Sequence, residues 1–260
     1  MPKFAANLTM LWNELGFLER FDAAAAAGFR GVEFLFPYAF PAAEIAQRLS
    51  RNRLSIVLHN LPAGNWEAGE RGIACHPGRV GEFQDGVGKA IEYAKALGVP
   101  QLNCLAGIVP QGVAPDTARA TFVANLAFAA AKLKAEGLRL LIEPINTFDI
   151  PGFFLSRTQQ ALDIIAATRS DNLFVQYDIY HMQRMEGELA NTIKAHLARI
   201  GHLQLADNPG RNEPGTGEIH YNRVLKQLWD LGYRGMVGTE LRPRKDELAA
   251  ARAVAAADVW

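Results

Sequence analysis

The stretch AEGLRLLIE, residues 135–143, connects the end of a helix-like segment through one glycine to an apolar run that ends in a carboxylate. Glycine at such a place can adopt the left-handed backbone conformation that ends a helix without a clash at Cβ. The same order recurs at 26–34 (AAGFRGVEF), 96–104 (ALGVPQLNC) and 230–238 (DLGYRGMVG). The repetition predicts helices that stop at Gly28, Gly98, Gly137 and Gly232, each followed closely by a strand.

Eight short apolar runs of this kind occur along the chain, as is typical of parallel strands covered by helices on the outside. They begin at Phe4, Arg30, Leu54, Gln101, Arg139, Leu173, Ile200 and Gly235. The segments between them predict helices at 14–27, 41–51, 78–97, 115–136, 156–168, 188–199, 221–231 and from Asp246 onward, with Pro41 and Pro115 suited to a first helical turn.

This alternation, with no linker in 260 residues, predicts an α/β fold: a single (β/α)8 TIM barrel that spans 1–260 as one domain. An open, doubly wound sheet is the structural alternative. It is disfavoured because no GxGxxG or Walker glycine loop follows the first run.

Composition narrows the class of protein. Lys plus Arg and Asp plus Glu number 27 each, so no net charge favours nucleic acid or a membrane surface as a partner. The two cysteines, Cys75 and Cys104, form no CxxC pattern and fit buried thiols in a reducing compartment. The N-terminal residues lack the apolar core of a signal peptide, and no stretch reaches transmembrane length. A cytoplasmic location is therefore expected.

Polar side chains interrupt four consecutive apolar runs near their carboxyl ends: Glu143, Asp178, Gln204 and Glu240. Consecutive strands of a barrel are neighbours, so these side chains are expected to converge at one end of the barrel. Three carboxylates and one amide would repel one another without a cation, and oxygen ligands suit Mg²⁺ or Mn²⁺ better than zinc. The alternative is that a separate core salt bridge satisfies each residue. This alternative would be the better explanation for any one of these positions alone, but it is the weaker one for four adjacent strands together.

Five further polar residues lie near these strand ends. His181 and Asp149 follow Asp178 and Glu143 by three and six residues, in expected strand-to-helix loops, and Arg211 follows Gln204 by seven. His59 ends the third run, and Arg71 lies in the long irregular segment 60–77. In the functional interpretation they bind substrate oxygens, with Arg71 or Arg211 pairing a carboxylate. In the structural interpretation they are caps, solvated charges or hydrogen-bonded core groups.

At these residues the chain resembles the xylose-isomerase-like TIM-barrel superfamily, and within it the branch of hydroxypyruvate isomerases. The resemblance covers almost the whole chain. It rests on FAANLTML, GFRGVEFLFPY, LHNLPAG, WEAGERGIAC, IEPINTFDIPGF, QYDIYHMQRMEGEL, GHLQLADNPGRNEPGTGEI and GTEL. It implies that Glu143, Asp178, Gln204 and Glu240 ligate one divalent metal ion, and that Glu143 and Glu240 form the acid/base pair. Related ketose epimerases usually place a histidine at the position of Gln204, and this departure agrees with the isomerase branch.

The resemblance implies an isomerase that interconverts hydroxypyruvate and tartronate semialdehyde (2-hydroxy-3-oxopropanoate) by proton transfer through an enediolate. No organic cofactor is expected, because no nucleotide-binding motif is present. A sister branch that acts on 2-oxo-tetronate is similar throughout, and the chemistry of the residues does not separate the two. An isomerase or epimerase of another small ketose stays the nearest alternative.

Two other classes of protein compete with an isomerase. A metal-dependent nuclease of the AP-endonuclease type shares this barrel, but needs more histidine ligands and a basic face than six histidines and zero net charge offer. A binding barrel without catalysis would not need an acid/base pair. The aromatic residues Trp12, Trp66 and Tyr180 fit ordinary packing, with shielding of the site or subunit contact as alternatives, so a homo-oligomer is left open.

Overall fold

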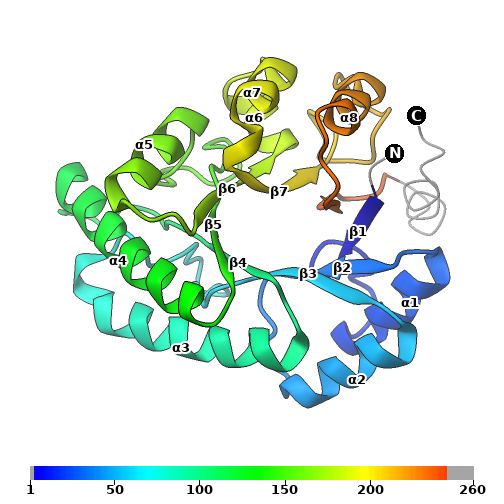
Figure 1. Cartoon of the computed structure of the whole chain (residues 1–260), viewed down its shortest axis with the longest axis horizontal. Helices are drawn as coiled ribbons and strands as arrows, with labels where there is room; N and C mark the ends of the chain where they lie inside the picture. The colour runs from blue at the N-terminus through cyan, green and yellow to red at the C-terminus, as the bar shows by residue number, and fades with distance from the viewer. Residues whose placement is uncertain (1–2, 245–260) are drawn as a thin grey trace.

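The computed structural model describes residues 3–244, and eight parallel strands in these residues form a closed barrel in chain order (Figure 1). This is the architecture that the repeated helix, glycine and strand pattern predicts. The strands are β1 (Lys3–Asn7), β2 (Gly31–Glu33), β3 (Ser55–Asn60), β4 (Gln101–Cys104), β5 (Arg139–Ile142), β6 (Leu173–Asp178), β7 (Ile200–Leu205) and β8 (Met236–Thr239).

Helices cover the outside of the barrel and connect successive strands. The α-helices are α1 (Arg20–Ala27), α2 (Ala42–Asn52), α3 (Val80–Leu97), α4 (Pro115–Ala135), α5 (Thr158–Thr168), α6 (Ile179–Met185), α7 (Leu189–His196) and α8 (Tyr221–Asp230). Short 3₁₀ segments are η1 (Phe17–Glu19), η2 (Pro77–Arg79) and η3 (Leu197–Arg199). The helix expected from Asp246 onward lies outside the described residues.

The predicted helix ends agree with the structure where glycine sets them. Gly28 caps α1 at φ 103° and Gly98 caps α3 at φ 72°, both left-handed conformations that a Cβ would strain. Pro115 is the first residue of α4, where its missing N–H removes no helical hydrogen bond. The first helix was predicted over 14–27 but begins later: residues 14–16 are not helical, η1 follows them, and α1 starts at Arg20.

The segment after β6 differs from the sequence prediction. Residues 179–185 form helix α6 directly after the strand, where we expected a loop that carries His181. The Asp178 carboxylate caps this helix, since it accepts the backbone N–H of Tyr180 at 2.7 Å and that of His181 at 3.3 Å. Seven residues are about two helical turns, too short for a clear periodicity in the sequence. His181 therefore lies on a helix whose start is fixed by a predicted metal ligand.

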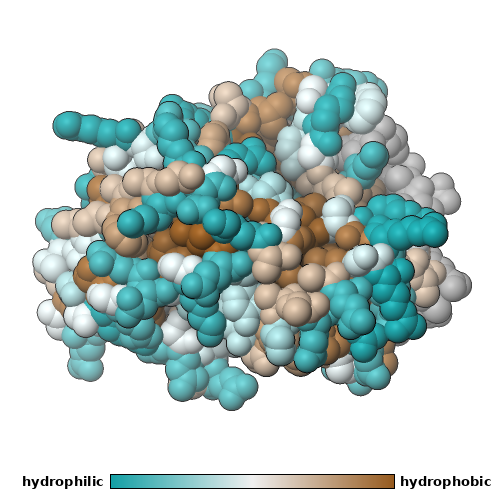
Figure 2. Space-filling model, turned by 60° about the horizontal axis from the view of Figure 1, so that its bottom comes forward, coloured by the Kyte–Doolittle hydropathy of each residue, from teal (hydrophilic) through white to brown (hydrophobic). Residues whose placement is uncertain are grey.

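The core lies inside the barrel and between the barrel and its helices. Leu102, Leu140 and Leu203 on three different strands have no exposed surface, and both predicted thiols are buried and free. Burial raises the pKa of Cys75 to about 12, so the thiol stays protonated near neutral pH. Figure 2 shows one face of the molecule, where hydrophilic side chains dominate the outline and hydrophobic residues lie between them. Within residues 3–244, no helix has both the length and the apolar character needed to span a bilayer.

Candidate active site

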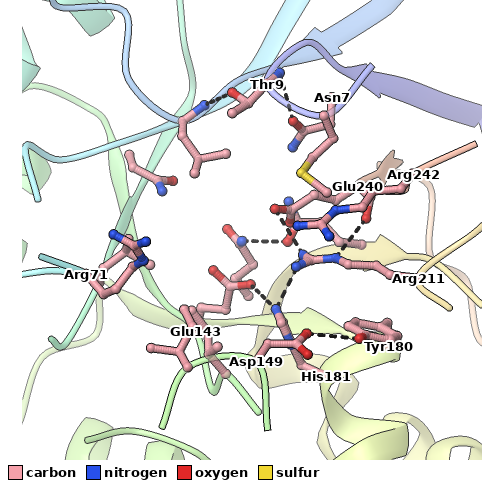
Figure 3. A pocket seen from close by; sticks show the side chains of 18 of the residues that line it. Asn7, Thr9, Arg71, Glu143, Asp149, Tyr180, His181, Arg211, Glu240 and Arg242 are labelled. Atoms are coloured by element: carbon pink, nitrogen blue, oxygen red, sulfur yellow. Dashed lines mark hydrogen bonds and ion pairs between the residues drawn. The ribbon is translucent and has the colours of Figure 1, made fainter. Parts of the chain in front are cut away.

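A cavity of about 830 Å³ opens at the carboxyl ends of the strands. Figure 3 shows that side chains from opposite sides of the barrel point into it. Seven of the nine predicted site residues line this cavity: Arg71, Glu143, Asp149, His181, Gln204, Arg211 and Glu240. The structure thus brings together residues that are distant in the sequence.

The strand register explains why the carboxylates meet. Asp178 at the end of β6 is the register partner of Gln204 on β7, and Gln204 is the partner of Gly238 on β8. Glu143 directly follows β5, and Glu240 directly follows β8. Four adjacent strands therefore present polar side chains at the same end of the barrel, as predicted from the sequence.

The centre of the cluster contains Glu143, Asp178 and His181, whose ligand atoms all lie within 4.8 Å of one another. His181 Nε2 lies 3.6 Å from Asp178 Oδ2 and 3.9 Å from Glu143 Oε1. Arg211 closes the other side, with Nη2 3.1 Å from Glu240 Oε1 and 3.6 Å from Asp178 Oδ2. The guanidinium thus lies between two carboxylates of the cluster.

Burial shifts the pKa of every carboxyl group in this cluster upward. It raises the pKa of Glu143 well above its ordinary range, and the nearby Glu240 and Asp178 carboxylates add to the shift. It raises the pKa of Glu240 to about 8, although Arg211 opposes the change. The pKa of Asp178 is raised for the same reason, and Arg211 opposes that shift too. As bare anions these groups are costly, so the cluster favours a bound cation or retained protons.

The donor set fits a divalent cation. Asp178 Oδ2 is buried and accepts no hydrogen bond from any group within residues 3–244. When all are ionised, the carboxylates of Glu143, Asp178 and Glu240 and the guanidinium of Arg211 sum to a charge of −2, which one divalent ion balances. Oxygen atoms dominate the set, and such ligands suit Mg²⁺ and Mn²⁺.

The amide of Gln204 is held in one orientation from below the cavity. Its Nε2 donates to Glu33 Oε1 at 2.7 Å, and its Oε1 accepts from Gln176 Nε2 at 2.6 Å. An amide oxygen has two acceptor positions, so Oε1 keeps one for a cation or a substrate. This fixed orientation agrees with the predicted ligand role of Gln204.

Sequence reasoning missed Glu33, a fully buried carboxylate at the end of β2. It accepts hydrogen bonds from Asn7 at 2.9 Å and Gln204 at 2.7 Å, and it lies 2.7 Å from His202 Nε2. Gly238 makes room for it, since a Cβ there would lie 2.3 Å from Glu33 Oε1. The signal was available, because a charge also interrupts the apolar run RGVEFLF. Glu33 thus lies beneath the cavity and orients the amide of Gln204 through this hydrogen bond.

Arg211 reaches the cavity from the loop between β7 and α8. Its backbone is left-handed, with φ 56°, and its guanidinium carbon lies 5.1 Å from the centre of the Tyr180 ring. Burial disfavours its charge, but the nearby carboxylates, Glu240 foremost, outweigh burial and raise the pKa of Arg211. The side chain is therefore a fixed cation in the pocket.

A single buried carboxylate organises the loop that carries Arg211. Asp207 accepts backbone N–H groups at 2.9–3.1 Å, and sequence reasoning did not single it out. The donors are Asn208, Gly215, Thr216, Gly217 and Ile219. Both ends of the loop are thus tied to one side chain next to β7.

Asp149 lies at the rim of the cavity and is already hydrogen-bonded. Its Oδ2 accepts from Asn146 Nδ2 at 3.0 Å and from the Tyr180 hydroxyl at 2.9 Å, and its Oδ1 pairs with Arg184 at 2.6 Å. Burial acts to raise the pKa of Asp149, but these hydrogen bonds outweigh it and lower the pKa. Asp149 thus links the β5–α5 loop, which contains residue 146, to helix α6.

Arg71 faces the cluster from the opposite side of the cavity (Figure 3). Its guanidinium lies 4.2 Å from the centre of the Trp66 ring and donates to the carbonyl oxygens of Trp66 at 2.9 Å and Glu70 at 2.7 Å. Among residues 3–244 no carboxylate forms an ion pair with it. Arg71 is therefore a positive charge held in place and open to an anionic ligand.

Three residues differ from the sequence predictions in their relation to the cavity. His59 is buried but does not line the cavity, because its ring stacks on Phe34 and approaches Tyr38, and burial lowers its pKa to about 4. Trp66 and Tyr180, assigned first to packing, do line the cavity. The lining also contains Arg184 and Arg242, which no sequence signal had identified.

Comparison with characterised proteins gives isomerases as relatives. The chain is 56% identical over 244 residues to hydroxypyruvate isomerase of Escherichia coli K12, a match that covers 94% of this chain and 95% of the relative. It is 48% identical over 244 residues to 2-oxo-tetronate isomerase of Cupriavidus necator, with 94% of each chain covered. The relatives thus include both activities that the sequence left open.

Solved structures share the fold over nearly the whole chain. A Brucella melitensis structure described as AP endonuclease, family 2, has a TM-score of 0.94 at 43% identity and 96% coverage of both chains. An Escherichia coli 3-keto-D-glucoside 4-epimerase has a TM-score of 0.81 and 98% coverage of both chains. Because the two sequences are only 19% identical, this likeness shows the fold alone. The model of the xylose isomerase-like TIM barrel family matches residues 21–258. The chain therefore belongs to the xylose isomerase-like TIM barrel family.

Proposed function

We propose that this protein is an isomerase that interconverts hydroxypyruvate and tartronate semialdehyde. The observation that carries the proposal is the pair of buried carboxyl groups, Glu143 and Glu240, within one cluster that faces a cavity. The E. coli relative, hydroxypyruvate isomerase, supports the choice of substrate. The zero net charge supports a small-molecule enzyme over a nuclease.

In this proposal one divalent ion, Mg²⁺ or Mn²⁺, is held by Glu143, Asp178, Gln204 and Glu240. When bound, the ion acts as a Lewis acid that stabilises negative charge on the substrate oxygens. Asp178 Oδ2 accepts no hydrogen bond within residues 3–244, and this free acceptor and the net negative charge of the cluster support the assignment.

Glu143 and Glu240 exchange protons with the substrate carbons. One glutamate removes a proton from C3 of hydroxypyruvate to give an enediolate, and the other delivers a proton to C2. Burial raises the pKa of both groups. That of Glu240, about 8, lies near neutral pH, where a carboxyl group can both accept and release a proton. His181 lies 3.9 Å from Glu143 and Arg211 lies 3.1 Å from Glu240, and in this proposal they assist the transfer of a proton between the two substrate oxygens.

Of the two candidate arginines, Arg71 is the better anchor for the substrate carboxylate. Arg211 is already paired with Glu240 and Asp178, so a second anion would compete with these contacts. Arg71 has no carboxylate partner within residues 3–244 and lies across the cavity from Glu240 (Figure 3). A substrate held between them would expose C2 and C3 to the glutamates.

A 2-oxo-tetronate isomerase is the second candidate function, and the 48% identical relative from C. necator favours it. This substrate has one carbon more and carries the same 2-oxo acid group. The cavity of about 830 Å³ accommodates either molecule, so volume does not separate them. The choice requires a direct comparison of turnover.

The test compares hydroxypyruvate, 2-oxo-tetronate and uncharged small ketoses as substrates for one purified sample with known metal content. We expect turnover of hydroxypyruvate to exceed that of the others, to vanish after chelation and to return with Mg²⁺ or Mn²⁺. DNA with an abasic site serves as a control substrate, and its cleavage without any isomerisation would overturn the proposal. Higher turnover of 2-oxo-tetronate would select the second candidate.

A further inference from the structure

The orientation of the Asn146 side chain is fixed by its own loop. Its Oδ1 accepts the backbone N–H groups of Phe148 at 3.1 Å and Asp149 at 2.8 Å. Its Nδ2 donates to Asp149 Oδ2 at 3.0 Å. A rotated amide would turn Nδ2 toward two N–H donors and the oxygen toward a carboxylate, so these contacts determine which atom is nitrogen.

The same Nδ2 lies 2.6 Å from Nδ1 of His181. The backbone N–H of Asn146 also points to this ring nitrogen, at 3.4 Å. Both groups are donors, so Nδ1 of His181 must be the acceptor and carries no proton. The proton of the neutral ring is therefore on Nε2, and an imidazolium, which needs a proton on both nitrogens, does not fit this arrangement.

The protonated Nε2 of His181 faces the catalytic cluster. It lies 3.6 Å from Asp178 Oδ2 and 3.9 Å from Glu143 Oε1. The guanidinium of Arg211 lies 3.5 Å from the same nitrogen, but it is also 3.6 Å from Asp178 Oδ2, so both donors converge on the carboxylate. The contact of 2.6 Å from Asn146 is much shorter and determines the tautomer.

With a proton on Nε2, His181 cannot use this nitrogen to ligate a cation bound by the surrounding carboxylates. A histidine that binds a metal through one ring nitrogen usually donates the other N–H to a carboxylate or a carbonyl oxygen. Here the other nitrogen faces an amide donor, the reverse of that arrangement. The short distances among Glu143, Asp178 and His181 therefore do not make His181 a ligand.

We propose that Asn146 is a positioning residue that holds His181 as the Nε2–H tautomer, so that His181 donates a hydrogen bond to a substrate oxygen and does not ligate the metal. The part of this inference that concerns the substrate rests on the proposed isomerase function. The part that concerns the tautomer and the metal does not. A neutral N–H donor stabilises an oxygen that gains negative charge as the enediolate forms.

The test is ¹⁵N NMR of histidine-labelled protein, with the H181Q spectrum used to assign His181 among the six histidines. We expect Nδ1 of His181 to resonate as an unprotonated nitrogen and Nε2 as an N–H, and we expect Mg²⁺ to leave Nε2 protonated. A protonated Nδ1 in the wild type, or loss of the Nε2 proton when Mg²⁺ is added, would overturn the inference.

The variant N146D retains Oδ1 for the two backbone N–H groups and replaces only the donor with an acceptor. We expect the tautomer to reverse and kcat to fall about 10- to 100-fold, with a smaller change in KM, as for other residues that orient a histidine. In N146D the new carboxylate lies beside that of Asp149, and the two could share a proton. The double variant N146D/D149N removes this possibility. The tautomer of His181 must also be reversed in the double variant when D149N is the reference. A reversed tautomer with wild-type kcat would contradict the role in the reaction.

The two proposals fail in distinguishable ways. If the wild type does not isomerise hydroxypyruvate, the proposed function is wrong, yet the NMR spectra still decide the tautomer. If the wild type is active and the tautomer is Nδ1–H, only the inference about Asn146 is wrong. Thermal unfolding of N146D, compared with N146A, establishes that both variants fold before either result is used.

Discussion

Nη2 of Arg211 lies 3.1 Å from Oε1 of Glu240, so a protein cation directly contacts one member of the proposed acid/base pair. The same nitrogen is 3.6 Å from Asp178, a proposed metal ligand. The guanidinium therefore has two electrostatic effects. It lowers the repulsion between the carboxylates, and it reduces the net negative charge that attracts a metal ion.

Replacement of Arg211 should separate these two effects. In R211Q we expect tighter binding of Mn²⁺, because a buried positive charge near the ligands is removed. We expect kcat to fall about 100-fold, because a donor to the substrate oxygens is lost. Calorimetric titration with Mn²⁺ and steady-state kinetics measure the two effects. R223Q, an exposed site on α8, is the control, and weaker Mn²⁺ binding in R211Q would contradict the electrostatic argument.

Both glutamates should be needed for turnover, and the one that removes the C3 proton should also be needed for exchange of that proton with solvent. In E143Q and E240Q the side chain keeps its size but cannot accept a proton, so we expect turnover to fall by about 10²- to 10⁴-fold. Proton NMR in D₂O follows incorporation of solvent deuterium into hydroxypyruvate. Exchange at the wild-type rate in one variant would identify the other glutamate as the base, and exchange at that rate in both variants would contradict the assigned roles.

The metal-free protein should lose stability as the pH rises from neutral to about 8. The folded-state pKa of Glu240 is about 8, against an ordinary value of 4.5, so over this range the folded state keeps a proton that the unfolded state has released. Proton binding therefore favours the folded state at lower pH, and this contribution disappears as Glu240 ionises. Thermal unfolding across this pH range measures the effect. The decrease of stability with pH should be smaller in E240Q and with saturating Mg²⁺. An equal decrease in E240Q and the wild type would contradict the assignment.

Arg71 should affect binding of the substrate carboxylate more than chemistry. A hydrogen-bonded charge pair contributes about 1.5–3 kcal/mol, so R71Q should raise KM for hydroxypyruvate about 10- to 100-fold with a smaller change in kcat. R71K keeps the charge but loses the planar stack on Trp66, and an intermediate KM is expected. Dihydroxyacetone has no carboxylate, and an equal loss of its turnover in R71Q would argue against this anchor.

Asp207 should be required for the position of Arg211. In D207N one acceptor oxygen becomes an amide donor that faces backbone N–H groups, and we expect the free energy of unfolding to fall by about 1–3 kcal/mol. Activity should fall as well, because the loop carries the cationic side chain. Denaturant unfolding and kinetics measure both effects. D163N, an exposed aspartate on α5, should change neither by much.

The barrel could be predicted because its signals are local. A glycine that ends a helix and an apolar run that follows it lie within nine residues, as in 135–143. The closed order of parallel strands then follows from the repetition of this unit. Helix α6 was missed because its cap, Asp178, is also the end of a strand, so no loop residues mark the boundary.

The site was predictable only in part, for a related reason. Glu143, Asp178, Gln204 and Glu240 stand out because each places a polar group where parallel strands are apolar. Asn146 carries no such signal, since its partner His181 is 35 residues away and the contact depends on the fold. Asp207 likewise reads as an ordinary loop residue until its backbone donors are seen.

The anchoring of the β7–α8 loop through Asp207 has a consequence for how substrate preference can change. Every anchoring bond uses a backbone N–H group, so most side chains between 208 and 219 can be exchanged without loss of the anchor. Gly217 is an exception, because a Cβ there would lie 2.0 Å from the Asn208 carbonyl oxygen. New specificities can thus arise by substitution along this segment while the barrel beneath it keeps its sequence.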